Sequence, residues 1–329
     1  MAQSPFDILT ETSSGYVVSR CLNAVAEAGI SDALGDAPQT PEYLAAATGT
    51  HAGALGRILR LLSSYGIFET RDGRYAHTPA SRLLRKDHPQ SLRSYVLMAN
   101  LPLFWNSFED IGHSLRTGEP AIDKAFPGGA WNYLANHPDE SRVFNEAMAA
   151  KAQGQIAGVI GSYDFSRFRT IADIGGGHGH LLRAVLAAAP QAKGILFDQP
   201  SVIREAAALG SDSLMLRGGD FFKDPVPIAD AYLLMQVVHD WAEPEATAIL
   251  SAVRRAAPSH AKLLLIEALV PDTPGPDWAK IVDLTMLALV SGKERTRSEY
   301  QKLLVGAGFQ LDRVIDVGQS TAILEAVPA

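Results

Sequence analysis

The sequence predicts a mainly helical winged-helix domain followed by a Rossmann-like, doubly wound α/β domain. Three observations lead to this fold class. The chain has 329 residues, more than one domain usually contains. Apolar residues recur with helical spacing through the first half. From about residue 165 onward, short apolar runs alternate with amphipathic stretches, as in a parallel sheet with helical crossovers on both faces.

Composition excludes several classes of protein. Hydrophobic residues make up 47% and charged residues 20%, which excludes a disordered chain, a collagen and a coiled-coil rod. The net charge of −7 provides no general attraction to nucleic acid or anionic lipid. The one cysteine, Cys21, excludes an internal disulfide framework and a cysteine-based zinc site. There is no signal-peptide pattern and no run of 18 apolar residues, so we expect a cytoplasmic protein that does not span a membrane.

The first expected helix covers residues 17–34, because apolar side chains recur there at steps of three and four. These side chains are Val18, Leu22, Val25, Ala26 and Ile30. Gly35 is expected to end the helix.

A helix–turn–helix–hairpin pattern follows. Thr40 is expected to cap a short helix that runs to residue 47, with Pro41 at its first position. A second helix covers about residues 51–65, and Asp72–Gly73 then joins two short strands. This order of elements is typical of a winged helix.

Two functions compete for the winged helix. Residues 40–86 contain seven Arg and Lys against three acids, which is compatible with DNA binding. The second helix, however, contains only Arg57 and Arg60 and has no Asn, Gln or Lys to read base edges. We therefore favour a packing and dimerisation module that binds no nucleic acid.

Residues 91–162 are expected to form further helices. Their aromatic and methionine side chains are mostly explained by core packing, and a few are expected to line an apolar pocket. The resulting division is a winged-helix domain at 1–95, a helical region that contributes to the substrate pocket at 96–163, and the α/β domain at 164–329.

The α/β domain has a regular alternation of elements. The expected strands are 170–174, 194–197, 214–216, 231–238, 263–268, 309–317 and 321–327. The expected helices are 180–189, 201–208, 244–257 and 297–306.

A glycine-rich turn follows the first of these strands, in the segment Ile171–His180. Glycines in the first strand–helix turn let the backbone approach a ligand closely. The spacing acid-x-G-x-G-x-G fits Asp173, Gly175, Gly177 and Gly179, and this is the form of the turn that binds S-adenosylmethionine. A nicotinamide site would need a third glycine where His180 stands.

Acidic and aromatic residues follow the next two strands. Asp198 lies nineteen residues after Gly179, where an acid can accept both ribose hydroxyls of a nucleoside, although it can also cap a helix. Asp220 and Phe221 follow the third strand and are suited to bind the amine and the face of an adenine. His239, at the end of the fourth strand, is in position for chemistry, although a helix cap is an alternative.

These features in this order resemble the class I S-adenosylmethionine-dependent O-methyltransferases, most closely the caffeic-acid O-methyltransferase-like family and its bacterial relatives. Further stretches agree with this resemblance: Phe144–Met148, Leu265–Glu267, Gly292–Thr296 and Ala307–Phe309. The resemblance covers nearly the whole chain, including the winged helix.

The resemblance implies roles for particular residues. His239 is the expected general base, with Glu267 and Glu294 beside it. The expected cofactor is S-adenosylmethionine, with no metal, and the winged helix is expected to form a homodimer. The residues expected at the cofactor are Asp173, Gly175, Gly177, Asp198, Asp220, Phe221 and Trp241. The residues expected at the acceptor are Phe144, Met148, Met286 and Asp240.

Two positions depart from the family pattern. The family often has Lys or Arg four residues before the histidine, where this chain has Met235. Val290 offers no polar group where plant members bind a phenol substituent. We therefore expect an acceptor other than a simple lignin phenol.

The side chains of His239, Glu267 and Glu294 are together suited to removing a proton from the acceptor. A phenol has a pKa of about 10 and a histidine has a pKa of about 6.5. Transfer of a proton from the phenol to the imidazole is therefore unfavourable by roughly 4.8 kcal/mol. Two carboxylates beside the imidazole raise its pKa and hold one tautomer, which reduces this difference. Spacing alone also allows Glu294 to form a salt bridge with Lys293 or Arg295. The neighbouring His178 and His180 lack a further ligand set and are not expected to bind a metal.

The sequence thus predicts an O-methyltransferase acting on a hydroxyl of a small, largely apolar, aromatic or polyketide-like metabolite. One alternative keeps the cofactor and changes the acceptor to an amine, a thiol or an aliphatic hydroxyl. An alternative from a different class of protein is a DNA-binding regulator that senses S-adenosylmethionine. Such a regulator would not need a general base, so the set of His239, Glu267 and Glu294 argues against it.

Overall fold

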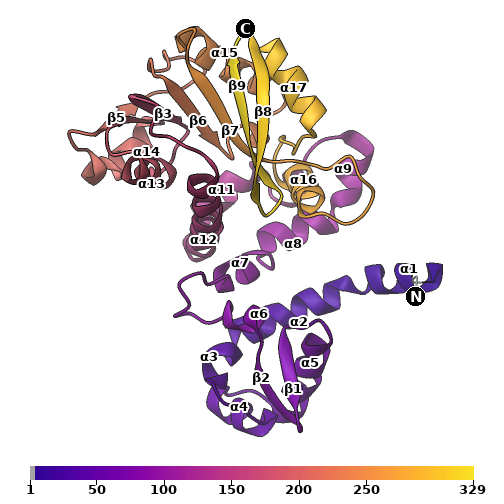
Figure 1. Ribbon diagram of the computed structural model, residues 1–329. Helices are drawn as coiled ribbons and strands as arrows, with labels where there is room; N and C mark the ends of the chain where they lie inside the picture. The colour runs from indigo at the N-terminus through magenta and orange to yellow at the C-terminus, as the bar shows by residue number, and fades with distance from the viewer. Residues whose placement is uncertain (1–3) are drawn as a thin grey trace. The chain divides into compact units, whose positions relative to one another are not determined.

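The computed structural model describes residues 4–329, which form two compact units (Figure 1). Unit 1 contains the chain up to Glu109 together with Ala130–Gly154, and unit 2 contains Asp110–Gly129 together with Gln155–Ala329. The domain boundaries predicted from the sequence, at residues 95 and 163, stay predictions. In the described part of the chain, no helix has the length and apolar character needed to cross a membrane.

Unit 1 is mainly helical with one small hairpin. Its elements are α1 (Pro5–Ser13), α2 (Gly15–Glu27), α3 (Ile30–Leu34), α4 (Pro41–Thr48), α5 (Ala52–Ser64), β1 (Phe68–Arg71), β2 (Arg74–His77), α6 (Pro79–Arg82), α7 (Arg93–Met98), α8 (Pro102–Glu109), α11 (Gly129–Asn136) and the first part of α12 (Pro138–Ser162).

The predicted helix–turn–helix–hairpin is confirmed. Thr40 caps α4, because its Oγ1 accepts a hydrogen bond from the backbone N–H of Tyr43 at 3.3 Å. Asp72 and Gly73 both have positive φ angles, 49° and 72°, which is the turn that joins two twisted strands. The predicted single helix over 17–34 is wrong in one respect: the left-handed Gly29 separates α2 from α3.

Unit 2 contains a seven-stranded sheet in the order β5-β4-β3-β6-β7-β9-β8. Its strands are β3 (Thr170–Ile174), β4 (Lys193–Asp198), β5 (Leu214–Gly218), β6 (Ala231–Met235), β7 (Lys262–Ala268), β8 (Phe309–Gly318) and β9 (Thr321–Pro328). Its helices are α9 (Ile111–Thr117), α10 (Ile122–Ala125), α13 (His180–Ala188), α14 (Pro200–Glu205), η1 (Ala207–Leu209), η2 (Val238–Asp240), α15 (Glu243–Ala256), α16 (Trp278–Leu289) and α17 (Arg297–Gly306).

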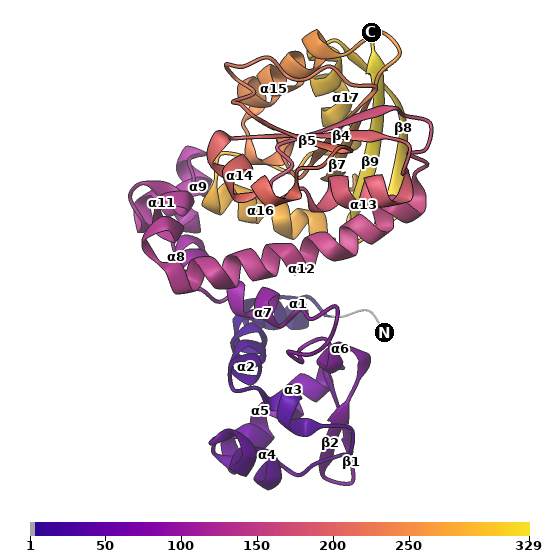
Figure 2. The same ribbon diagram turned by 90° about the vertical axis from the view of Figure 1, so that its left-hand side faces the viewer.

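The strand order of the sheet locates the edge at which a ligand is expected. Strands β3 to β7 are parallel, and β9 inserts antiparallel between β7 and β8. The strand order reverses between β3 and β6, and ligands bind at such a point, outside the carboxyl ends of the strands. Figure 2 shows α15 and α17 on one side of the strands and α13 on the other. Alternate residues of each central strand therefore enter two cores, with Tyr232 in one and Leu233 in the other.

Two elements of unit 2 differ from the sequence prediction. The fourth strand was expected to reach Val238 but ends at Met235, because Gln236 takes a left-handed conformation with φ of 54°. Helix α16, which contacts α9, was not predicted. It follows a Pro- and Gly-rich stretch and is capped by Asp277, whose side chain accepts a hydrogen bond from the N–H of Ala279 at 2.8 Å.

Candidate functional site

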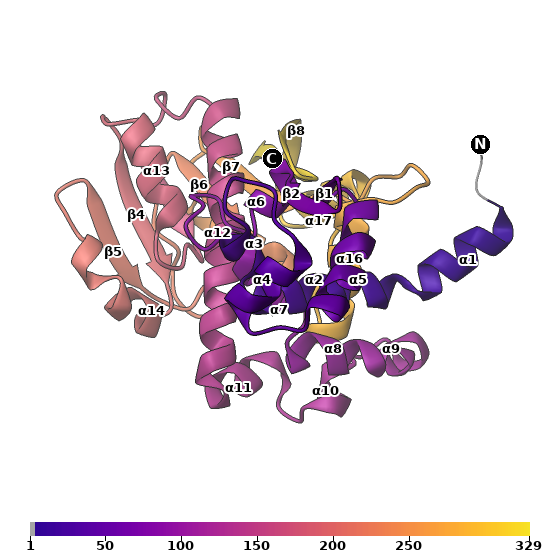
Figure 3. The same cartoon turned by 90° about the horizontal axis from the view of Figure 1, so that it is seen from below.

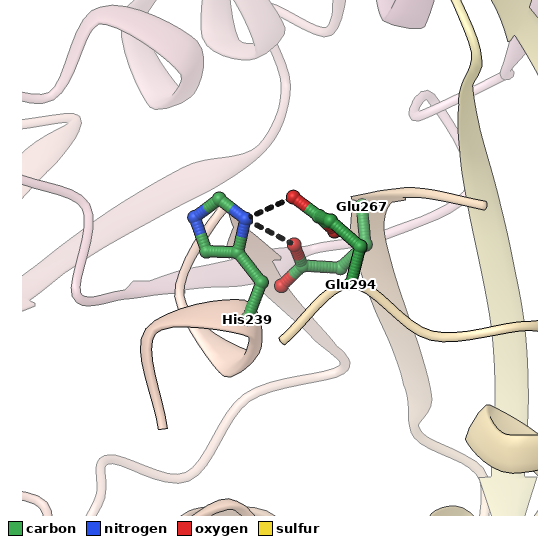
Figure 4. A group of neighbouring side chains, drawn as sticks. All are labelled: His239, Glu267 and Glu294. Carbon is green, nitrogen blue, oxygen red and sulfur yellow. Dashed lines mark hydrogen bonds and ion pairs between the residues drawn. The ribbon is translucent and has the colours of Figure 1, made fainter. Parts of the chain in front are cut away.

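Three buried side chains meet beyond the carboxyl ends of β6 and β7 (Figure 4). His239 lies on the short turn η2, Glu267 is near the end of β7, and Glu294 is in the loop after α16. The Nδ1 atom of His239 is 2.6 Å from Oε1 of Glu294 and 3.9 Å from Oε2 of Glu267. The sequence-predicted trio is therefore brought together around one ring nitrogen, and Nε2 lies on the other side of the ring.

The main chain at the end of β6 orients Glu267. Its Oε1 accepts hydrogen bonds from the N–H groups of Val237 at 3.2 Å and Val238 at 2.9 Å. These consecutive amides follow Gln236, whose positive φ is uncommon for a residue with a side chain. The turn that ends the strand early thus supplies two donors to a buried carboxylate.

The loop after α16 lies directly against the turn that carries His239. A Cβ on Gly292 would be 1.9 Å from the carbonyl oxygen of His239, so this position requires glycine. The N–H of Glu294 donates to Asp283 Oδ1 at 3.0 Å, and the carbonyl of Arg295 accepts from Val270 at 3.1 Å. The loop is therefore bonded to α16 and to the segment after β7.

Charge in this cluster is governed by burial and by the two acids. Burial opposes the protonated form of His239, but the charge of Glu267 and the hydrogen bond to Glu294 raise its pKa to about 9. Burial also raises the pKa of Glu267 to about 7, against the opposing effect of the nearby imidazole. The cluster thus binds protons more strongly than its separate groups would in water.

The same three residues are of the types that bind metal ions, and among residues 4–329 their ligand atoms lie within 4.8 Å of one another. The 2.6 Å distance from Nδ1 to Glu294, however, is that of a charge-assisted hydrogen bond. Two ligands on one zinc ion, each about 2.0–2.2 Å from the metal, would be farther apart. The geometry therefore favours a hydrogen-bonded cluster.

The glycine-rich turn lies at the end of β3. Gly175, Gly177 and Gly179 have φ angles of 69°, 55° and 68°, which side chains with a Cβ rarely adopt. Asp198, at the end of β4, accepts a hydrogen bond from the N–H of Gly177 at 2.8 Å. The predicted acid at the second strand is therefore in direct contact with the predicted ligand-binding turn.

Asp173 is buried within this region, and its Oδ2 has no hydrogen-bond partner among the described residues. Burial, together with the neighbouring charge of Asp198, raises the pKa of Asp173 to about 7. An unpartnered buried carboxyl oxygen is costly, so a ligand that donates a hydrogen bond here would be stabilised.

The predicted aromatic residues also come together. The rings of Phe221 and Trp241 lie edge to face, with centroids 5.9 Å apart. Asp220 forms an ion pair with Lys223 at 2.9 Å and accepts from the N–H of Phe222 at 2.9 Å. A ligand amine at the predicted position would therefore compete with the Lys223 ammonium for the Asp220 carboxylate.

The residues predicted for the acceptor pocket lie in both units. Asp240 Oδ1 is 3.5 Å from Nε2 of His239, and Met286 is on α16. Phe144 and Met148 are on the part of α12 in unit 1, where the ring of Phe144 meets Trp131 edge to face. Their assignment to the pocket stays a prediction.

Sequence reasoning missed several residues that build the site. Gln236 shapes the turn after β6 through its positive φ. Asp283 and Arg295 hold the loop of Glu294 and turn η2 through hydrogen bonds that no local pattern indicates. Gly292 and Arg295 belong to the stretch Gly292–Thr296, which is part of the family resemblance. The sequence therefore pointed to these two residues but did not indicate what they do.

Comparisons with known proteins agree on one family. A family model described as the O-methyltransferase domain matches residues 108–310, and one described as the O-methyltransferase dimerisation domain matches residues 10–87. A phenazine O-methyltransferase of Lysobacter antibioticus is 40% identical, covering 98% of this chain and 96% of the relative. An 8-amino-8-demethylriboflavin N,N-dimethyltransferase of Streptomyces davaonensis is 36% identical, covering 94% of this chain and 91% of the relative.

The solved structures agree as well. A methyltransferase of calicheamicin biosynthesis, in a form that contains S-adenosylhomocysteine, is similar with a TM-score of 0.91. It is 33% identical, and the match covers 100% of both chains.

Proposed function

Since this chain belongs to the family of S-adenosylmethionine-dependent O-methyltransferases, we propose that it methylates a hydroxyl group of a small, largely apolar, aromatic or polyketide-like metabolite. The observation that carries this proposal is the imidazole of His239, which has two carboxylates near Nδ1, those of Glu267 and Glu294. Its Nε2 lies on the opposite side of the ring, 3.5 Å from Oδ1 of Asp240, and this is the side on which we place the acceptor. Transfer to oxygen requires removal of a hydroxyl proton, and this arrangement suits a general base.

The residues present fit S-adenosylmethionine. The left-handed glycines allow close approach of a ligand to the main chain, and Asp173 has an unpartnered buried oxygen. We propose that Asp173, Gly175 and Gly177 hold the amino-acid part, Asp198 the ribose, and the pair Phe221 and Trp241 the adenine, with Asp220 at its amine. When bound, this cofactor supplies an electrophilic methyl group on a sulfonium.

His239 is the proposed general base, acting through Nε2. Glu294 accepts the hydrogen bond from Nδ1 and so holds one tautomer, and Glu267 stabilises the imidazolium that forms. A base with a pKa of about 9 reduces the unfavourable difference from a phenol. The acceptor is proposed to lie against Asp240, Met286, Phe144 and Met148.

A paired-acceptor assay tests the choice of oxygen. Phenols and the anilines of the same ring systems are offered to the wild type, to His239→Gln and to His260→Gln. His260 is an exposed histidine paired with Asp230, so it serves as the matched control. We expect methylation of phenols, a loss of roughly 10²–10⁴-fold in kcat for His239→Gln, and no change for the control.

Two results contradict the proposal. Methylation of anilines without methylation of phenols would assign the site to a nitrogen acceptor. Retention of phenol methylation within threefold by His239→Gln would remove the histidine from its role as base.

A nitrogen acceptor is the second candidate, because the riboflavin-type relative that covers 94% of this chain is named an N,N-dimethyltransferase. The cofactor site is the same for both candidates, and the paired acceptors distinguish them directly.

We also propose that the chain forms a homodimer through unit 1, in line with the dimerisation-domain match. Helix α1 has nine residues and buries none of them, and it extends beyond the rest of unit 1 (Figure 3). Phe6 and Leu9 on this helix are 74% and 72% exposed. A helix this short is marginal in water by itself, so a second copy is the proposed cover for its apolar face.

A further inference from the structure

Arg295 has the largest fully buried side chain among the described residues, and the proposed reaction gives it no part. Removing a guanidinium from water is costly unless each N–H group finds an acceptor and the geometry is good. A buried arginine beside a reacting group therefore requires a physical account.

All five donors of Arg295 are used. Nη1 donates to the carbonyl oxygens of Val238 at 3.2 Å and Lys293 at 3.3 Å. Nη2 donates to the carbonyl of Trp241 at 3.1 Å and to Glu243 at 3.2 Å, and Nε donates to Glu243 at 3.3 Å. Only one of these acceptors is charged, and the Glu243 side chain is 57% exposed. Most of the bonds of this guanidinium are thus to main chain.

Two of those carbonyls lie on either side of His239. Val238 precedes it, and Trp241 follows it by two residues, so the guanidinium spans the whole of turn η2. Arg295 also follows Glu294 directly in the chain. The turn with the base and the loop with its carboxylate are therefore joined twice: by the imidazole–carboxylate bond and by the guanidinium.

We propose that Arg295 is a positioning residue for methyl transfer: its planar guanidinium fixes turn η2 against the loop of Glu294, and so keeps His239 within hydrogen-bond distance of that carboxylate. This inference rests on the proposed role of His239 as base. The charged groups that face the ring are Asp240 on its own turn, Glu267 on β7 and Glu294 on the loop.

A purely electrostatic role of Arg295 predicts a different change in the pKa of His239. If Arg295 acted only through its charge, its removal would raise the pKa of His239, because a nearby positive charge would be lost. If it positions the ring, its removal lengthens the bond to Glu294 and the pKa falls toward the ordinary value of about 6.5. The direction of the change therefore distinguishes the two roles.

The experiment compares Arg295→Lys, Arg295→Met and Arg254→Lys with the wild type. Lysine keeps the charge but lacks the planar set of five donors. Arg254 is the matched control, since it also donates to main-chain carbonyls, those of Gly308 at 2.9 Å and Ala329 at 3.1 Å. The imidazole of His239 is titrated by NMR in the protein without ligands, kcat and KM are measured, and thermal melts report folding.

We expect both Arg295 variants to lower kcat at least tenfold, with KM within threefold, and to lower the pKa of His239. The control is expected to leave the titration of His239 and kcat unchanged, whatever its effect on the melting temperature. An unchanged or raised pKa in Arg295→Lys and Arg295→Met overturns the proposal, as does activity loss that only follows the folded fraction.

The two parts of the experiment fail separately. If the wild type methylates no hydroxyl acceptor, the proposed function fails, and the titration of His239 still decides whether Arg295 positions the ring. If methylation proceeds through His239 and the titration is insensitive to Arg295, the positioning role alone is rejected.

Discussion

His239 has two acids near one ring nitrogen, so the charge of the site depends on pH. Burial disfavours the imidazolium, and Glu267 and Glu294 more than offset this effect. The outcome is a ring that binds a proton more strongly in the folded protein than in the unfolded chain. Two neighbouring groups with displaced pKa values are typical of acid–base sites.

Stability without ligands is expected to decline as pH rises from 7 to 9. The pKa of His239 is raised from 6.5 to about 9, so its contribution is fully present below pH 6.5 and is lost as pH rises through 9. The raised pKa of Glu267, about 7 against 4.5, has the same sign and acts between pH 4.5 and 7. Melting temperatures at pH 6.5, 7.5 and 9 measure the combined effect of His239 and Glu267 on stability.

The variant His239→Gln is the control for this pH dependence. It should show a clearly smaller decline in melting temperature between pH 7 and 9. An equal decline in the variant, or a rise in the wild type, would show that other groups determine the stability in this range.

The short connections after β3 and β6 determine where several of the chemical groups lie. Each leaves a parallel strand at the same edge of the sheet, and each contains a backbone feature that a regular element lacks. The turn after β3 has left-handed glycines, and the turn after β6 has the left-handed Gln236. These features let the main chain donate to carboxylates, as Gly177 does to Asp198 and Val238 does to Glu267.

Gly176→Ala is expected to reduce binding of S-adenosylmethionine at least tenfold. A Cβ there would be 2.5 Å from Cγ of Asp173 and 2.6 Å from Cδ1 of Leu196, so the turn must move. Overpacking of this kind costs about 1–3 kcal/mol. Calorimetric titration measures the affinity.

Gly306→Ala is the matched control, because a Cβ there has no neighbour within 4 Å and the residue is in helix α17. It should bind normally and be stabilised by up to ~1 kcal/mol. Wild-type affinity in Gly176→Ala would show that the turn adjusts without loss of the binding site.

At the level of the complete chain, unit 1 supplies no part of the trio of His239, Glu267 and Glu294. Its exposed apolar side chains on α1 nevertheless require an explanation, because contiguous apolar patches on a surface mark interaction sites. Assembly of two copies is the explanation that we propose.

The double variant Phe6→Ser with Leu9→Ser is expected to shift the protein from a dimer toward a monomer of 35.2 kDa. Light scattering after size-exclusion chromatography measures the mass. The control is Met215→Ser with Ile228→Ser, which changes two side chains in unit 2 that are 60% and 71% exposed. A mass that does not change in the α1 variant, or that falls equally in both, would reject α1 as part of the interface.

Local patterns in the sequence determined the elements and the kind of site. The Thr40 cap, the Asp72–Gly73 turn and the glycines after the first strand depend on interactions within a few residues, so they could be predicted. The prediction of the sites after β3, β4 and β6 depended on the rule that parallel strands end at one edge.

Only the tertiary structure decided how the side chains meet. Glu294 is 55 residues from His239, and its approach to Nδ1 depends on the path of α16, which no local pattern predicted. The early end of β6 and the five bonds of Arg295 likewise result from packing between segments distant in sequence. Residue type and period determine local conformation, whereas distances between segments are determined by strand order and by the burial of charged groups that must find partners.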